Sequence, residues 1–345
     1  MKIAIVNNCV PFIAGGAEHL GESLRRKLIE YGHEAILVRI PFRWTPAEKI
    51  IDHILANRLL RLDGADRVIA LKFPAYMVPH KNKVLWLLHQ FRQAYDLWGT
   101  PYQDIPDTSD GERIRQLIIQ ADNQYLPEAR KIYTNSHVTG ERLRTFNGIE
   151  SETLFPPLER TDHFYSSGYG DYLFYPSRIT QGKRQTLIVE ALKHTKTPVR
   201  LVIAGQPETP SDQESIERIV DEASLRQRVD LIPRFITEQE KADLFAKALG
   251  CTYVPFDEDS YGYVTLEAYH CRKPVITCTD SGGTTIVVKD GETGLVVPPS
   301  PQAIGHAMDR LYEERAASKS MGEAGYELMS ALGINWKTVV ERLTA

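Results

Sequence analysis

The chain has 345 residues, of which 42% are hydrophobic and 25% charged, with a formal net charge of −4 at pH 7. This length favours two domains of roughly 150 residues each, and the absence of excess positive charge argues against nucleic acid as a partner. The four cysteines lack zinc-type spacing, no apolar run approaches a membrane span of about 20 residues, and the N-terminus is unlike a signal peptide. We therefore expect a cytoplasmic globular protein.

The first half of the chain alternates apolar runs with helical patterns. The run at 2–6 is followed by a loop with Gly15 and Gly16, and leucines at helical spacing predict an amphipathic helix at 17–31. Further strands are expected at 34–40, 66–72, 83–90 and 131–136. Strand, helix and strand in this order are typical of a doubly wound parallel sheet.

The alternation breaks at 154–171, a stretch rich in proline, glycine and polar residues that suits an interdomain linker. It then restarts, with strands expected at 172–178, 199–205, 229–233, 251–256 and 274–279, and helices at 183–195, 213–226, 238–248, 263–272 and 301–329.

This pattern predicts an α/β protein made of two Rossmann-like, doubly wound domains. We place the N-terminal, acceptor-binding domain at 1–157, the C-terminal, donor-binding domain at 158–330, and a tail that can cross back to the first domain at 331–345. Two such domains facing one another would form an interdomain cleft, where folds of this kind bind their ligands.

The segment 257–267 places two acids, Asp259 and Glu267, on either side of Gly262. It follows an expected strand and runs into a helix, whose N-terminus suits a phosphate group. The two carboxylates would repel phosphate, but they can accept hydrogen bonds from hydroxyl groups on either side of it. The ribose and the sugar of a nucleotide diphosphate sugar have this layout. The alternative is a helix-capping acid and a solvated helix glutamate.

Two cations lie at and just after the end of the strand expected at 172–178. Arg178 and Lys183 lie five residues apart, just before a helix. They could clamp a diphosphate and stabilise the charge that develops when it leaves. The alternative is a solvated basic loop.

Other loops at strand ends carry weaker signals. Gly282 and Gly283 follow the strand at 274–279 and indicate either a close approach to a ligand or a tight turn. The pair in the loop after the first strand is not the GxGxxG motif of dinucleotide-binding folds. His89 ends the strand at 83–90 and could bind a sugar hydroxyl or be structural.

Taken together, these segments resemble the retaining GT-B glycosyltransferases of family 4. That family carries a pattern close to E-x-FG-hydrophobic-x-x-x-E-A-x-x-x-G-x-P-V-I, and residues 259–277 read DSYGYVTLEAYHCRKPVIT. The resemblance covers the second half of the chain well and the first half loosely. It implies a GT-B fold and transfer of a sugar, with retention, from a nucleotide diphosphate sugar to an acceptor hydroxyl.

The resemblance also implies roles for individual residues. Asp259 would face the transferred sugar and Glu267 the ribose, while the base would lie near Arg234 and Phe235. The residues expected to act in catalysis are Arg178, Lys183, Asp259 and His89. The residues expected to bind the donor are Gly15, Gly16, Gly205, Arg234, Phe235, Asp259, Gly262, Tyr263, Val264, Thr265 and Glu267.

Three positions depart from the family pattern. Asp259 replaces a glutamate and Arg272 replaces a glycine, while Ile286 stands where the segment after the paired glycines usually has a glutamate. The shorter side chain at Asp259 requires the sugar or the loop to shift. These differences bear on which donor is used and on how active the protein is.

The resemblance implies a front-face mechanism, in which the departing phosphate oxygen accepts the proton of the acceptor hydroxyl. No prosthetic group is expected, and a UDP-sugar is favoured over a GDP- or ADP-sugar. The acids at 257–259 match a D-x-D metal motif, but that motif belongs to a single-domain fold, so no metal is expected. The rival functions are a nucleotide-sugar epimerase and a non-catalytic protein that binds a nucleotide sugar or a glycan.

The acceptor is expected to be a carbohydrate, a lipid-linked sugar or a small molecule. The polar and aromatic stretch at 90–126 would shape its site, with Arg92 and Tyr95 as contacts. The stretch at 41–62 is amphipathic and basic and contains Trp44. It fits a helix packed on its own sheet better than a peripheral contact with the cytosolic face of a membrane.

Overall fold

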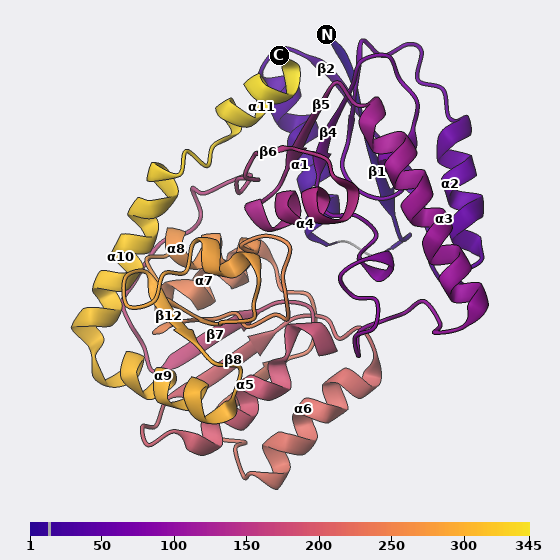
Figure 1. Ribbon diagram of the computed structural model, residues 1–345. Helices are drawn as coiled ribbons and strands as arrows, with labels where there is room; N and C mark the ends of the chain where they lie inside the picture. The colour runs from indigo at the N-terminus through magenta and orange to yellow at the C-terminus, as the bar shows by residue number, and fades with distance from the viewer. Residues whose placement is uncertain (13–14) are drawn as a thin grey trace. The chain divides into compact units, whose positions relative to one another are not determined.

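A computed structural model describes residues 1–12 and 15–345, which divide into two compact units (Figure 1). Unit 1 comprises Met1–Glu159 and Asn335–Ala345, and unit 2 comprises Arg160–Ile334. The last eleven residues thus belong to the same unit as the N-terminal segment. No helix within the described ranges is both long enough and apolar enough to cross a membrane.

Within its described residues, unit 1 contains a six-stranded parallel sheet in the order β2-β1-β3-β4-β5-β6. Its strands are β1 Lys2–Cys9, β2 Glu34–Pro41, β3 Arg67–Ala70, β4 Lys83–Leu87, β5 Lys131–Thr134 and β6 Glu152–Thr153. Its α-helices are α1 Gly16–Glu30, α2 Lys49–Leu59, α3 Ser109–Tyr125, α4 His137–Asn147 and α11 Trp336–Thr344. The strand order reverses between β1 and β3, so the loops that follow these two strands flank the switch point of the sheet.

Both faces of this sheet are buried. Ile3 and Ile5 of β1 pack in a cluster that includes residues of α1 and α11, whereas Ala4 and Val6 belong to a second cluster. Successive strand residues point to opposite faces, so a strand covered on both sides reads as an unbroken apolar run. This explains why residues 2–6 showed no alternation of polar and apolar side chains.

An acidic side chain lies deep in unit 1. Asp122 of α3 is completely buried and accepts hydrogen bonds from the hydroxyl groups of Tyr76 (2.8 Å) and Tyr95 (2.7 Å). Burial raises the pKa of the Asp122 carboxyl to about 7, although both hydroxyl groups favour its ionised form. Tyr95, expected from the sequence to contact an acceptor, is therefore part of this buried network.

Unit 2, all of whose residues are described, contains a second six-stranded parallel sheet in the order β12-β11-β10-β7-β8-β9. Its strands are β7 Tyr172–Pro176, β8 Arg200–Ala204, β9 Val229–Ile232, β10 Gly250–Thr252, β11 Val275–Cys278 and β12 Gly294–Val297. Its α-helices are α5 Gln185–Ala191, α6 Pro210–Glu222, α7 Glu238–Lys247, α8 Tyr263–His270, α9 Pro301–Glu313 and α10 Arg315–Ala331.

Numbered along unit 2, this order is 3-2-1-4-5-6, the arrangement of the Rossmann fold. The prediction of two doubly wound α/β halves is confirmed. The short strands β6 and β12 were not predicted, and 90–126 was described only as a polar and aromatic stretch, although α3 occupies much of it. Most side chains of α3 are polar, and its buried face includes only a few residues at helical spacing, among them Ile114, Ile118 and Asp122.

Candidate functional site

The switch point of the unit 2 sheet lies between β7 and β10, which are neighbours in the sheet although β8 and β9 lie between them in the chain. Chain connections leave these strands in opposite directions, and in open α/β sheets ligands bind beside the carboxyl ends of the strands at such a switch point. The connection after β7 carries Arg178 and Lys183, and the connection after β10 carries Asp259 and Gly262. The fold thus brings two of the sequence-predicted segments to one edge of one sheet.

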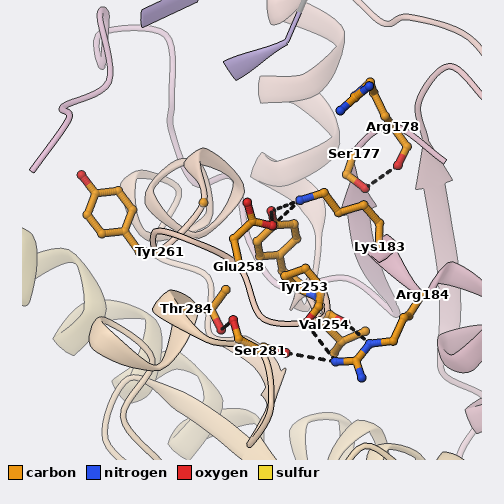
Figure 2. Close-up of polar contacts among 12 residues, drawn as sticks. Ser177, Arg178, Lys183, Arg184, Tyr253, Val254, Glu258, Tyr261, Ser281 and Thr284 are labelled. Carbon is orange, nitrogen blue, oxygen red and sulfur yellow. Dashed lines mark hydrogen bonds and ion pairs between the residues drawn. The ribbon is translucent and has the colours of Figure 1, made fainter. Parts of the chain in front are cut away.

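The Lys183 side chain, in the connection after β7, contacts residues in the connection after β10. It ends the 3-10 helix η4 (Gln181–Lys183), and its Nζ forms an ion pair with the Glu258 carboxylate and donates to the Tyr253 hydroxyl (2.9 Å). The Tyr253 hydroxyl donates in turn to Glu258 Oε2 (3.1 Å). Figure 2 shows these three side chains converging, while Arg178 extends separately from the start of its loop.

Sequence analysis missed Glu258 and Tyr253. The expectation from the sequence was that Lys183 binds the diphosphate and Asp259 the transferred sugar, and Glu258, one residue before Asp259, had no expected role. The structure shows Glu258 as the acid that contacts Lys183. Burial, followed by the nearby Glu258 carboxylate, raises the pKa of the Tyr253 hydroxyl well above its ordinary value, so Tyr253 is a neutral hydrogen-bonding group here.

Arg184, also missed, fixes three strand-end loops together. Its guanidinium makes two hydrogen bonds to the Asp280 carboxylate (2.7 and 2.8 Å) and donates to the carbonyl oxygens of Val254 (2.8 Å) and Pro255 (2.9 Å). These partners follow β10 and β11, whereas Arg184 precedes α5. A bidentate pair with extra main-chain acceptors orients all three loops. The sequence signal was an arginine beside Lys183 and an aspartate just after a strand.

The paired glycines allow the loop after β11 to lie directly against the loop after β10. Gly283 N donates to Glu258 O (2.7 Å), and Gly282 has φ of +58°. A Cβ atom on Gly282 would lie 2.5 Å from Glu258 O, and one on Gly283 would lie 2.6 Å from Ser260 C. Only glycine fits this contact, so these two residues shape the segment that carries the acids.

Gly262 serves as the N-cap of α8. It has φ of +69°, and a Cβ atom there would lie 2.4 Å from the Tyr253 ring. The expected donor-binding residues Tyr263, Val264 and Thr265 form the first turn of this helix. Thr265 is buried, and its hydroxyl donates to Gly262 O (2.7 Å). An α-helix leaves its first N–H groups without acceptors of its own, which makes this turn suitable for an anion.

Glu267 is 5% exposed and forms an ion pair with Lys241 of α7, with 2.6 Å between Oε1 and Nζ. Lys241 also pairs with Glu238 (3.0 Å). Burial lowers the pKa of the Lys241 ammonium, but the two carboxylates outweigh it and the net shift is upward. The carboxylate expected to face the ribose is therefore held in place by the ammonium group of Lys241.

The other predicted residues of unit 2 lie in more exposed or purely structural positions. Arg178 is exposed, and its Nη1 lies 4.0 Å from Glu208 Oε1. A Cβ atom on Gly205 would overlap Ser177 O, so this glycine lets the ends of β7 and β8 pack together.

Arg234 and Phe235 follow β9 on the protein surface. Arg234 pairs with Glu240 (2.8 Å), and Phe235 is 62% exposed.

The predicted glycines of unit 1 lie at the switch point of its own sheet. Gly15 is the N-cap of α1, Gly16 is its first residue, and Gly15 N donates to Glu18 Oε2 (2.9 Å). Lys72, which follows β3, pairs with the same carboxylate (2.9 Å). Burial opposes ionisation of Glu18, yet Lys72 and the main-chain donors bring its pKa below the ordinary value.

His89 and Arg92 also follow the carboxyl end of a unit 1 strand, β4. His89 Nδ1 lies 2.6 Å from Gln90 O, and the imidazole is partly exposed. Arg92 Nε donates to Asp96 (2.7 Å), and Arg142 lies 3.6 Å from the same carboxylate. Across residues 1–12 and 15–345, no group of three or more His, Cys, Asp or Glu side chains could hold a metal ion.

Comparison with known proteins agrees with this geometry. Residues 167–328, nearly all of unit 2, match the family model of the glycosyl transferases group 1. The D-inositol 3-phosphate glycosyltransferase of Mycobacterium leprae is 28% identical over 257 residues, which are 70% of this chain and 57% of that protein. The chain thus spans little more than half the length of this curated relative.

Solved structures show the same fold along the whole chain. Sucrose-phosphate synthase from Thermosynechococcus elongatus superimposes with a TM-score of 0.79 at 19% identity, covering 99% of this chain and 97% of that one. Anabaena HepE in complex with UDP-glucose gives 0.75 at 14% identity, covering 100% and 98%. At these identities the likeness establishes the GT-B-like fold.

Proposed function

We propose that this chain, which belongs to the group 1 glycosyl transferases through its C-terminal half, transfers a sugar with retention from a nucleotide diphosphate sugar to an acceptor hydroxyl. The observation that carries the proposal is the arrangement at the unit 2 switch point. There Lys183, the first turn of α8 and the loop with Asp259 come together at the carboxyl ends of β7 and β10.

Each part of this arrangement has a task in the proposed reaction. The first turn of α8 and Lys183 bind the diphosphate, and their positive charge stabilises the charge that grows on it as the bond to the sugar breaks. Glu267, held by Lys241, accepts hydrogen bonds from the ribose. Asp259 accepts hydrogen bonds from the transferred sugar. Arg178 joins Lys183 at the diphosphate by turning inward from its exposed position.

The acids position the donor and do not act as nucleophiles in this scheme. Retention then follows from a front-face reaction, in which the leaving phosphate oxygen takes the proton of the acceptor hydroxyl. Neither acid needs a shifted pKa for that task, because orientation alone can lower the barrier by several kcal/mol (about 7–11 at most). No metal ion is required by the proposal.

We assign donor binding to unit 2 and acceptor binding to unit 1. A UDP-sugar is the proposed donor, since HepE, which shares the fold, has been crystallised with UDP-glucose. Phe235 lies exposed after β9, beside Arg234, where it can cover the base. The acceptor is proposed to be a small hydroxyl compound or a sugar.

The test is a panel of UDP-, GDP- and ADP-sugars, each incubated with the full chain and a set of hydroxyl acceptors that includes inositol phosphate. Product formation is followed by mass spectrometry, and the anomer is assigned by NMR. The proposal expects transfer with retention, lost in Asp259→Ala and weakened in Glu267→Ala. Epimerised donor without transfer would establish the epimerase instead. Donor binding without any turnover would establish a non-catalytic relative.

Intact donor binding and turnover in both variants would reject the assigned roles of the two acids. Asp259→Glu provides a matched control, because it restores the length that the family pattern has at this position. It is expected to retain transfer, with a change in preference among donor sugars.

A further inference from the structure

Cationic side chains gather at the amino ends of the unit 1 strands, away from the strand ends that carry Gly15, His89 and Arg92. Arg67 is the first residue of β3, Lys131 is the first residue of β5, and Arg130 precedes it. Strands β3, β4 and β5 are neighbours and parallel, so their first residues meet at one edge of the sheet. Nothing in the proposed transfer reaction uses this edge.

These cations line a cavity of about 380 Å³ that lies wholly within unit 1. Arg342 of α11 adds a fourth positive charge to its wall, and Asn82 and Tyr133 supply polar groups. The volume is enough for a phosphate group with a small organic substituent, since sites for small ligands begin at about 300 Å³.

The charges around the cavity do not balance. Lys131 and Arg342 share one carboxylate, that of Glu152. Across the described residues, neither Arg67 nor Arg130 has an acidic side chain within ion-pair distance. Among the described residues, Glu152 is thus the one acidic side chain within ion-pair distance of these four cations, and Ala345 at the end of the chain also lines the cavity.

Arg67 is the buried one of the four, whereas Arg130, Lys131 and Arg342 are exposed. Its side chain is only 8% exposed, Nη1 donates to Leu343 O (2.8 Å), and Nε meets no acceptor within the described part of the chain. Burial, then repulsion by Arg130, lowers the pKa of the guanidinium. A buried cation with an unused donor is costly unless an anion compensates it.

Asn82 lies in the wall of the cavity beside these cations. Its Nδ2 donates to Asp66 O (2.8 Å), and its buried Oδ1 meets no donor among the described residues. A phosphate group presents several charged acceptor oxygens, which suit the guanidinium donors of the arginines.

We propose that this cavity binds a phosphate group, as inorganic phosphate or as a small phosphate monoester, between Arg67 and Arg130 with Lys131 and Arg342 on its rim. The rival interpretation is purely structural. In it, the cations donate hydrogen bonds to main-chain carbonyl groups at the end of α11, as Arg67 does to Leu343 O, and no ligand binds in the cavity.

Calorimetric titration of the full chain at constant ionic strength tests the proposal, with inorganic phosphate and glucose 6-phosphate as separate ligands and chloride as the reference anion. Arg130→Gln is the diagnostic variant because Arg130 is exposed and its loss should leave folding intact. Arg113→Gln, on an exposed position of α3, is the matched control. Loss of one charge-assisted contact should raise Kd about tenfold in Arg130→Gln and leave it unchanged in Arg113→Gln.

The two phosphate ligands separate the sources, since the one with the lower Kd identifies whether the free ion or an ester is bound. Equal Kd values in Arg130→Gln and Arg113→Gln would overturn the proposal, as would heats no larger than those of chloride. Phosphate binding that disappears in Lys183→Met instead would place the ion in unit 2, which also overturns it. A tungstate-soaked crystal with an anomalous peak beside Arg67 and Arg130 would locate the site directly.

Discussion

The Lys183 ammonium group is held by the carboxylate of Glu258, the neighbour of Asp259, and both contact the Tyr253 hydroxyl. The proposed diphosphate site thus already contains an anion of the protein's own. Because the Lys183 and Glu258 side chains are 21% and 24% exposed, water screens the pair only in part. A donor diphosphate must compete with Glu258 for this cation.

Replacing Glu258 should therefore tighten nucleotide binding. In Glu258→Gln, Lys183 no longer has to leave a carboxylate, and partly exposed pairs contribute up to about 1 kcal/mol. We expect the Kd for UDP to fall two- to fivefold, roughly, by isothermal titration calorimetry.

Glu208→Gln is the matched control, because it removes an acid that lies 4.0 Å from exposed Arg178. It should change the Kd by less than about twofold. Weaker UDP binding in Glu258→Gln would contradict the competition argument and would assign Glu258 a supporting role in holding Lys183 toward the donor.

Glu267 should affect stability as well as donor binding. Glu267→Gln leaves Lys241 with the more exposed Glu238 as its charged partner, so the free energy of unfolding should fall by about 1–3 kcal/mol. The double variant Lys241→Met/Glu267→Gln should recover much of this loss in urea unfolding, while donor binding remains impaired. Recovery of both properties would show that Glu267 acts on the donor only through folding.

Gly282 and Gly291 offer a comparison between crowding and backbone strain. Both have positive φ, but a Cβ atom on Gly282 would strike Glu258 O, whereas nothing lies within 4 Å of one on Gly291. Gly291→Ala should cost only the strain of its backbone conformation, about 1 kcal/mol. Gly282→Ala should cost more and should also weaken UDP binding, because it displaces the acidic loop. Equal losses of unfolding free energy, with normal UDP binding, would contradict the role given to this contact.

Asp122 should make unit 1 less stable as the pH rises. Its pKa is about 7 in the folded protein and about 3.9 in an unfolded chain, so between these values only the folded state holds the proton. This group's contribution to the free energy of unfolding should then fall by about 1.4 kcal/mol for each pH unit between 4 and 7.

Urea titrations at pH 4 to 8 check this dependence. Asp122→Asn removes the titrating group, so the stability of the variant relative to the native protein should rise across this pH range. Asp52→Asn, an exposed acid on α2, is the control and should show no such trend. Parallel pH profiles for Asp122→Asn and the native protein would refute the prediction.

The fold was predictable because strands buried on both faces, such as Ile3–Val6, give unbroken apolar runs between helical patterns. The edge at which Lys183, Gly262 and Gly282 meet was predictable too, since parallel strands end together. The contact between Lys183 and Glu258 was not. The run 257–259 contains three neighbouring acids. The direction of each side chain depends on the backbone of the loop, which has positive φ at Asp257, and no periodicity in the sequence encodes that direction.

Helix α11 escaped detection for another reason. Trp336, Val339, Val340 and Leu343 follow a helical spacing, but the segment is short and its buried partners are distant in the chain. Tertiary packing decides the structure of such a segment, because isolated helices below about 12 residues are marginal in water. The cavity at the amino ends of the strands could not be predicted for the same reason, because Arg342 in its wall is far in the chain from the other lining residues, such as Arg67 and Arg130.

The return of α11 to unit 1 constrains how the protein can be made. Trp336 packs edge-on against Trp86, and Val339, Val340 and Leu343 share its cluster with β1 and α1. A nascent chain that has emerged only as far as Glu159 still lacks this part of its first core, and the whole of unit 2 is translated before the missing helix appears. Unit 2, contiguous in sequence, can fold as soon as it leaves the ribosome. We therefore expect the unit that is synthesised first to be the one that finishes folding last.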